Sequence, residues 1–164
     1  PALDIYMRFL GHDKSVAGDN IKFFDTVGVH YPFQIEREGR ISRMCNPIGY
    51  DKNKKALICE SEVPEGSQFR FSTPPDFDII ETVLEEATEL KEYSKMEAEA
   101  LLVFSCAGRL SALGPLVESE NEGLYDIWKA PMAGFFTYGE FGRGLDGIHD
   151  FHSTTNSWVA LTEK

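Results

Sequence analysis

The most informative stretch of this chain is residues 100–109, which read ALLVFSCAGR. Its first half is apolar and lacks the alternation of a half-exposed strand, so it predicts a central β-strand, 99–104, covered on both faces. Its second half is small residues and Arg109, followed by a helical pattern that reaches Tyr125 and breaks near Gly114 and the proline after it. Ligands favour the carboxyl ends of central strands, so we expect part of a binding site there.

Before this strand, residues 74–93 predict a long helix, with Thr73 as its N-cap. Its acidic side carries Glu81, Glu85 and Glu89, which is typical of a solvated face or, alternatively, of a docking surface for a basic partner. Its apolar stripe has the helical spacing and consists of Phe77, Ile80, Val83, Leu84, Ala87 and Leu90.

The N-terminal part predicts one helix over 2–10 and a loop over 12–29. It then predicts a four-stranded antiparallel meander, because short alternating runs are separated by turn signals. Its strands are 33–36, 40–45, 55–60 and 68–72.

The C-terminal part predicts a strand over 132–138, a glycine-rich segment over 140–147 and a closing strand over 156–162. The whole pattern predicts one α+β domain over 1–164. We expect an antiparallel or mixed β-sheet with helices packed on it.

Composition limits the function classes. The chain has 164 residues, of which 42% are hydrophobic, as expected for one globular domain. Sixteen Lys and Arg against 27 Asp and Glu give a net charge of −11, which disfavours binding to nucleic acid or to anionic membranes. The longest apolar run is only as long as a strand, which predicts no membrane span.

The three cysteines are an odd number and do not form a disulfide framework. We expect Cys45 and Cys59 to be small buried apolar residues, and reduced thiols favour a cytoplasmic location. No compact metal-ligand spacing occurs, and the glycines match neither a dinucleotide-binding nor a Walker phosphate loop. The sequence therefore predicts no metal and no cofactor.

The first candidate site is residues 105–109. Cys106 and Gly108 are small enough to let backbone amides approach a ligand, and Arg109 has the planar fork that suits a carboxylate or phosphate. The alternative is a tight connection between strand and helix, in which Arg109 pairs with an acid of the chain itself.

The second candidate site is residues 134–142, which read GFFTYGEFG. Glu140 could hold an ammonium group beside Gly139, while Phe135, Phe136 or Tyr138 could form the wall of a pocket. The alternative is a glycine-rich bulge or hairpin in which Glu140 is exposed.

The third candidate contains two histidines, His149 and His152. Their spacing would suit a metal on a helix, but the stretch does not have a helical pattern. A hydrogen-bonding pocket role for His152, or a structural one, fits better. Cys106, His152 and Glu140 could also form a nucleophile, a base and an orienting group, which is the catalytic alternative.

These motifs, in their order, resemble the C-terminal domain of the FIST family, whose name stands for F-box and intracellular signal transduction. The resemblance extends over about residues 1–162. It rests on the opening helix 1–11, the entry His30-Tyr-Pro-Phe33, the segments 43–50 and 63–66, the run 104–109, the run 134–140 and the final His/Thr-rich element. One departure is that His152 is followed by Ser-Thr-Thr before Asn156, whereas the family pattern has an Asn sooner.

The resemblance implies an intracellular sensory domain that binds small ligands such as amino acids and catalyses no reaction. The matched positions are Cys106, Gly108, Arg109, Gly139 and Glu140. Family members usually carry an N-terminal FIST domain first, and we expect this chain to be either the C-terminal half of such a protein or a stand-alone relative. The implied partners are that N-terminal domain, a signalling output domain or protein, and a possible second copy of the chain.

The residues and the resemblance together predict an amino-acid site. Arg109 would bind the carboxylate and Glu140 the ammonium group, with Tyr138 and His152 nearby. Two other functions stay open at this point: a hydrolase that uses Cys106, and a structural module for dimerisation or protein docking. A lowered pKa of Cys106 would favour the hydrolase, and a large exposed apolar patch would favour docking.

Overall fold

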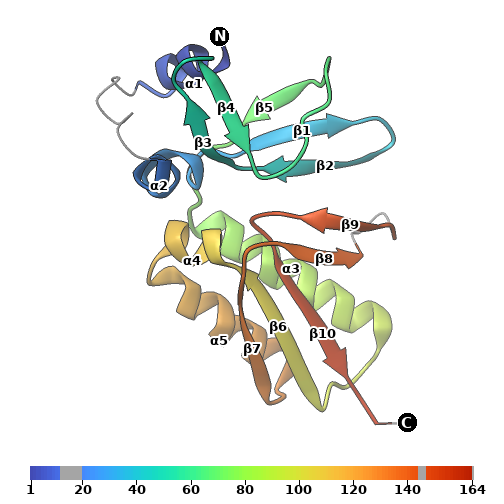
Figure 1. The fold of residues 1–164 in the computed structure, drawn as a ribbon. Helices are drawn as coiled ribbons and strands as arrows, with labels where there is room; N and C mark the ends of the chain where they lie inside the picture. The colour runs from blue at the N-terminus through green and yellow to red at the C-terminus, as the bar shows by residue number, and fades with distance from the viewer. Residues whose placement is uncertain (12–19, 144–146, 164) are drawn as a thin grey trace. The chain divides into compact units, whose positions relative to one another are not determined.

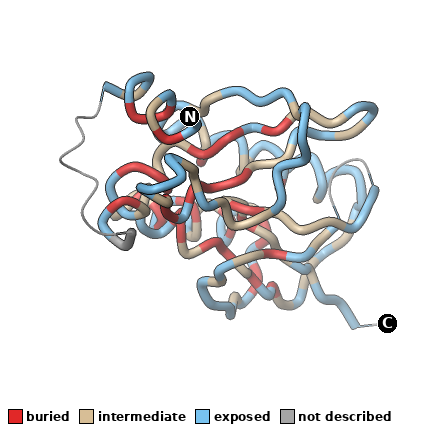
Figure 2. The backbone as a smooth tube through the Cα atoms, turned by 45° about the horizontal axis from the view of Figure 1, so that its top comes forward, coloured by how far each residue is buried: buried red, intermediate tan, exposed pale blue. Residues whose placement is uncertain are grey.

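The computed structural model describes residues 1–11, 20–143 and 147–163 (Figure 1). It is an α+β structure, as the sequence predicts, and its contacts divide into two compact units. The first unit is built around residues 1–74, and the second contains residues 75–143 and 148–164. Buried and exposed residues alternate in short runs along the backbone (Figure 2), as amphipathic helices and strands require.

The first unit contains two small antiparallel sheets. One has the strand order β2-β1-β5, and the other pairs β3 with β4. The bounds are β1 Phe33–Arg37, β2 Arg40–Cys45, β3 Pro47–Asp51, β4 Ala56–Cys59 and β5 Phe69–Phe71.

Helix α1 (Ala2–Phe9) confirms the predicted first helix, and Gly11 follows it at φ +69°. Its buried side presents Tyr6 to an aromatic core, where the Tyr6 and Phe33 rings lie 5.4 Å apart, edge to face. The Tyr6 hydroxyl donates a hydrogen bond of 2.8 Å to the Tyr31 carbonyl. Burial is the largest cause that raises the pKa of this hydroxyl.

The predicted four-stranded meander is wrong in its pairing. Residues 47–51 form a strand that was not predicted, β3, which pairs with β4, while β5 pairs with β1. Pro47 and Tyr50 are buried, and the Pro47 carbonyl lies so close to Gly28 that a Cβ there would be 2.0 Å from its oxygen. This packing joins residues far apart in the sequence, so local turn signals could not predict it.

The predicted loop is also wrong over residues 20–28, and its part over 12–19 lies outside the described residues. Helix α2 (Asn20–Phe23) leads into a π-helical turn, η2 (Phe24–Gly28). Phe23 and Val27 are both fully buried there, so core packing fixes this segment as helical despite its polar neighbours.

The second unit is built on a mixed sheet in the order β10-β6-β7. The central strand β6 (Ala100–Cys106) is antiparallel to β10 (Asn156–Leu161) and parallel to β7 (Met132–Thr137). Parallel neighbours need a crossover, which is formed by α4 (Ala107–Leu113) and α5 (Leu116–Trp128). These elements confirm the predicted central and closing strands and the helix break before Leu116.

Helix α3 (Phe77–Ser94) confirms the predicted long helix and packs beside α5 on one face of this sheet (Figure 1). Its N-cap is Asp76 rather than Thr73, and the Asp76 carboxylate accepts a hydrogen bond of 2.7 Å from the Phe77 amide. The shared core contains Ala87, Leu101, Val103, Leu124 and Trp128.

Strand β6 is not covered on both faces. Leu101, Val103 and Ser105 are buried on the face that packs on the helices, whereas Leu102 is 38% exposed. A hairpin of β8 (Glu140–Arg143) and β9 (His149–His152) precedes the closing strand. None of the helices in the described part of the chain is long and apolar enough to span a lipid bilayer.

Candidate functional site

Three predicted residues lie where β6 ends. Cys106 is the N-cap residue of α4, and its amide donates a hydrogen bond of 2.9 Å to the Thr155 carbonyl. Gly108 and Arg109 are buried in the first turn of the helix. The chain thus turns directly from the central strand into a helix, as the small residues predict.

Arg109 is paired inside the unit, but its partner is Glu120 rather than Glu140. Its Nη2 contacts Glu120 Oε1, and its Nη1 donates to the Thr154 carbonyl at 3.3 Å. The Arg109 side chain is 7% exposed and that of Glu120 is fully buried. Asn156 Nδ2 donates to the second Glu120 oxygen at 2.8 Å. The structure therefore contains the alternative in which Arg109 pairs with an acid of the chain itself.

Glu140 is also held within the chain. It is 3% exposed, which makes the alternative of an exposed Glu140 wrong. The Thr137 hydroxyl donates to Oε1, and the Thr155 hydroxyl donates to Oε2 at 3.0 Å. Both oxygens of this carboxylate therefore have donors from neighbouring segments, and a ligand ammonium would have to compete with them.

One segment joins the two buried carboxylates. Where β10 begins, Thr154 contacts Arg109, Thr155 contacts Glu140, and Asn156 contacts Glu120. Buried charges are tolerated only when they are paired and hydrogen-bonded, so these contacts fix the end of the sheet. We call this set of side chains the carboxylate network: Arg109, Glu120, Thr137, Glu140, Thr155 and Asn156.

Sequence reasoning did not identify Glu120, although a signal for it exists. Val117, Leu124 and Trp128 are the other buried residues of α5, and Glu120 falls on the same helical stripe. A buried carboxylate on an apolar stripe needs a cationic partner. Arg109 lies in α4, the helix just before α5, and is therefore a candidate for that partner. The threonines and Asn156 carry no comparable signal.

Cys106 lacks the electrostatics of a nucleophile. Burial and then the negative charge of Glu140 raise the pKa of its thiol. The hydrolase alternative called for a lowered pKa, since the thiolate is the nucleophile. His152 Nε2 lies 3.2 Å from the Gly142 carbonyl oxygen, which accepts a hydrogen bond from this nitrogen when it is protonated.

The remaining predicted residues are spread along the β8–β9 hairpin and the bend before it. Tyr138 is 92% exposed. Gly139 is tightly packed, because a Cβ there would lie 2.4 Å from the Phe151 ring. His149 and His152 are three residues apart on one strand and so point to opposite faces, which does not suit shared metal ligation. Among the described residues, no three His, Cys, Asp or Glu side chains gather as a metal site.

The other two cysteines lie together in the first unit and are not merely apolar. Hydrogen bonds from Cys59 and Ser61 lower the pKa of Cys45 to about 6, while the pKa of Cys59 is raised. Ser61 Oγ donates to Cys45 Sγ at 3.2 Å. All three cysteines are free thiols.

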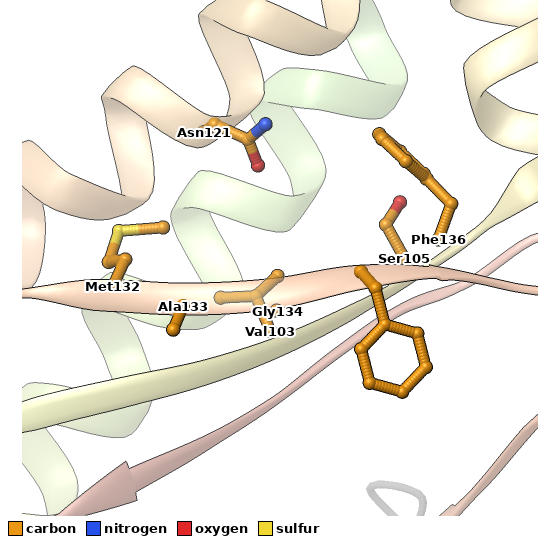
Figure 3. Close-up of a pocket in the computed structure, with 8 residues that line it drawn as sticks. Val103, Ser105, Asn121, Met132, Ala133, Gly134 and Phe136 are labelled. Carbon is orange, nitrogen blue, oxygen red and sulfur yellow. The ribbon is translucent and has the colours of Figure 1, made fainter.

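A pocket of about 280 Å³ opens beside the β6–β7 pair, under α5 (Figure 3). Asn121 points from the helix toward the sheet, and the Ser105 hydroxyl lies between the strands and the helix. We call this hollow the β7 pocket. It is lined by Val103, Ser105, Asn121, Met132, Ala133, Gly134, Phe135 and Phe136.

The β7 pocket exists because Gly134 has no side chain. Met132, Gly134 and Phe136 pair in register with Leu101, Val103 and Ser105 of β6. A Cβ on Gly134 would lie 1.8 Å from the Val103 carbonyl oxygen, so this backbone admits only glycine. The missing side chain leaves a gap between Met132 and Phe136 (Figure 3).

None of the seven predicted site residues lines this pocket. The predicted segments 105–109 and 134–142 contribute Ser105, Gly134, Phe135 and Phe136 to its lining, of which the two aromatic residues were expected as a pocket wall. Asn121 was not identified, because a single amide on a polar helix gives no sequence signal. Ligand binding stays a prediction for all seven of them: Cys106, Gly108, Tyr138, Gly139, His152 and the paired residues Arg109 and Glu140.

Comparisons with known proteins gave one result. The model of the FIST C domain family matches residues 2–143. The match includes the β7 pocket and Glu140 but ends before His152 and β10. Neither the comparison with curated proteins nor the one with solved structures gave a match.

Proposed function

Because this chain belongs to the FIST C domain family, a family of sensory-type signal-transduction domains, we propose that it binds a small ligand as the input of a signalling protein and catalyses no reaction. The observation that carries this proposal is the β7 pocket with the buried Ser105 hydroxyl, which is hydrogen-bonded to no group among the described residues. A concave site with a few convergent polar groups is the usual form of a ligand site.

The resemblance implies an amino-acid ligand, and this proposal keeps that ligand class but moves its site. Arg109 is paired with Glu120, and Glu140 accepts hydrogen bonds from two threonines, so both residues already stabilise the fold without a ligand. Amino acids and small carboxylates are therefore the first compounds to test, but at the β7 pocket. A cytoplasmic location and partnership with an N-terminal FIST domain and an output domain or protein complete the proposal, and the free thiols support that location.

A thermal-shift screen tests the proposal. The full chain is heated with amino acids, small carboxylates and uncharged metabolites in turn. A ligand at 100 times its dissociation constant adds about 2.7 kcal/mol of stability, which raises the melting temperature of a chain of this size by roughly 5–11 °C. The shift should disappear in Asn121→Ala and persist in the matched control Glu122→Ala, whose side chain is exposed on the same helix.

Two results would contradict the proposal. One is no shift with any compound class, and the other is a shift that Asn121→Ala and Ser105→Ala leave intact. The second result would place the ligand elsewhere in the chain.

A second candidate function is protein docking or dimerisation, and one surface favours it. The face of the β10-β6-β7 sheet opposite the helices carries apolar pairs in register: Leu102 with Val159, and Phe104 with Phe135. Leu102, Val159 and Phe135 are 38%, 49% and 64% exposed. Sedimentation at increasing concentration distinguishes the two candidates, since a ligand-binding monomer keeps its mass while a docking module associates.

A further inference from the structure

The β7 pocket has no charged side chain in its lining. Its residues are apolar or glycine except for Ser105 and Asn121. A carboxylate or ammonium that enters such a site loses its hydration and gains no opposite charge in return. With a net charge of −11, the chain as a whole also repels anions. The lining therefore suits an uncharged ligand.

Ser105 provides the first polar contact. It is 5% exposed and lies at the end of the buried face of β6, and its Oγ has no hydrogen-bond partner within residues 1–11, 20–143 and 147–163. A serine hydroxyl has one hydrogen to donate and two lone pairs that can accept. Because a buried polar group without a partner costs free energy, this atom gains from a ligand that satisfies it.

Asn121 provides the second contact, from the opposite wall. It is half-buried on α5, and its carboxamide is directed toward the sheet (Figure 3). A carboxamide offers a carbonyl acceptor and an amino donor side by side. Its natural counterpart is another amide, which presents the same two groups in reverse order.

The apolar walls favour a flat ligand. Met132 and Phe136 stand on either side of Gly134 and leave a slot between a thioether and an aromatic ring (Figure 3). The pocket volume of about 280 Å³ exceeds the roughly 150 Å³ of a cavity that holds benzene. A single aromatic ring with one substituent therefore fits within this space.

We propose that the β7 pocket binds an uncharged aromatic amide, whose ring lies between Met132 and Phe136 and whose carboxamide bonds to Asn121 and Ser105. This inference rests on the proposed ligand-binding function and names the chemical class of its ligand. It assigns recognition to the carboxamide rather than to an anionic carboxylate, although the two groups have nearly the same shape.

The test uses matched pairs of probes on the full chain at neutral pH. Benzamide is compared with benzoate, and nicotinamide with nicotinate, by titration followed through backbone amide chemical shifts. Each amide should bind at least about tenfold more tightly than its carboxylate, because a site built from hydrogen-bonding groups rejects the analogue that mispairs with them. Asn121→Leu, close in shape to Asn, should abolish amide binding, whereas Glu122→Gln should leave it unchanged.

The outcomes separate this inference from the proposed function. Equal or tighter binding of the carboxylates overturns the amide preference but leaves ligand binding in place. Binding of amino acids without any binding of the two amides at millimolar concentration has the same meaning. No binding by any probe overturns both, and unchanged amide binding in Asn121→Leu overturns the assigned contacts.

Discussion

Two groups of polar side chains lie near the end of the same strand, β6, and they differ in what satisfies them. In the carboxylate network, both oxygens of Glu120 and of Glu140 accept hydrogen bonds from the chain itself. In the β7 pocket, the buried Ser105 hydroxyl has no hydrogen-bond partner among the residues that the structure describes. The difference separates two kinds of buried polarity: one group is paired within the fold, and the other is the group that we propose is available to a ligand.

The comparison also explains why the sequence favours charged residues as candidates. Arg109 and Glu140 are the most chemically conspicuous residues of their segments, which made them the natural candidates for ligand binding. A buried charge is tolerated only with a partner, so its partner is usually built into the fold. An uncharged serine and asparagine beside a glycine are less conspicuous, but they lie where a ligand can reach them.

The largest expected effect is on the carboxylate network. Arg109→Ala leaves the Glu120 carboxylate buried without its cation, and breaking such a pair costs about 3–5 kcal/mol. Urea unfolding, followed by circular dichroism, measures the loss. The exposed pair Lys129 and Asp126 provides a control, because Asp126→Ala should cost less than about 1 kcal/mol.

Ser105→Ala makes the same comparison from the other side. It removes a buried hydroxyl for which the described part of the chain provides no hydrogen-bond partner, so the free energy of unfolding should stay within about 1 kcal/mol of the original. A loss as large as that of Arg109→Ala would show that Ser105 supports the fold, and the distinction between the two groups would fail.

The next effect concerns the glycine that creates the pocket. Gly134→Ala places a Cβ against the Val103 carbonyl and should destabilise the chain by about 1–3 kcal/mol or more. Gly142→Ala is the matched control in strand β8, since its Cβ would meet only ordinary contacts at 3.9 Å and beyond. Equal melting temperatures for the two variants would contradict the close approach of β6 and β7.

The smallest effect is the pH dependence from Cys106. Its pKa is raised in the folded state by burial and by Glu140, so the folded chain holds this proton more tightly than the unfolded chain does. The stabilisation is present below the ordinary thiol pKa of 9.0 and is lost as the pH rises through the raised value. Stability should therefore fall above about pH 9, and less steeply in Cys106→Ala. An identical slope in both proteins would show that Cys106 is not the group responsible.

Much of the fold follows from local patterns. The apolar run before Ser105, the stripe of α3 and the break at Gly114 all predict their elements, because each depends on neighbours in the sequence. The predicted meander is wrong because Pro47 of β3 packs against Gly28. No local sequence pattern indicates this contact. The sequence predicts β10 as a closing strand, but it does not predict that β10 pairs with β6 or in which register.

The β7 pocket was predictable only by segment. Ser105, from the first candidate segment, and the aromatic residues Phe135 and Phe136, from the second, belong to its lining. The partner of Arg109 depends on how α4 turns back into α5, which places Glu120 beside it. The β7 pocket depends on Asn121, which reaches the strands only once that crossover has formed.

The most direct test of the account is to map which residues change their backbone amide chemical shifts when a ligand binds. Backbone amide shifts of the isotope-labelled chain are recorded with saturating benzamide, or with the best compound from the thermal-shift screen. The account predicts that the largest changes lie at 103–105, 121 and 132–136, the residues around the β7 pocket. Changes centred instead on Arg109, Glu140 and His152 would show that the carboxylate network is the ligand site after all, and would contradict the division drawn between them.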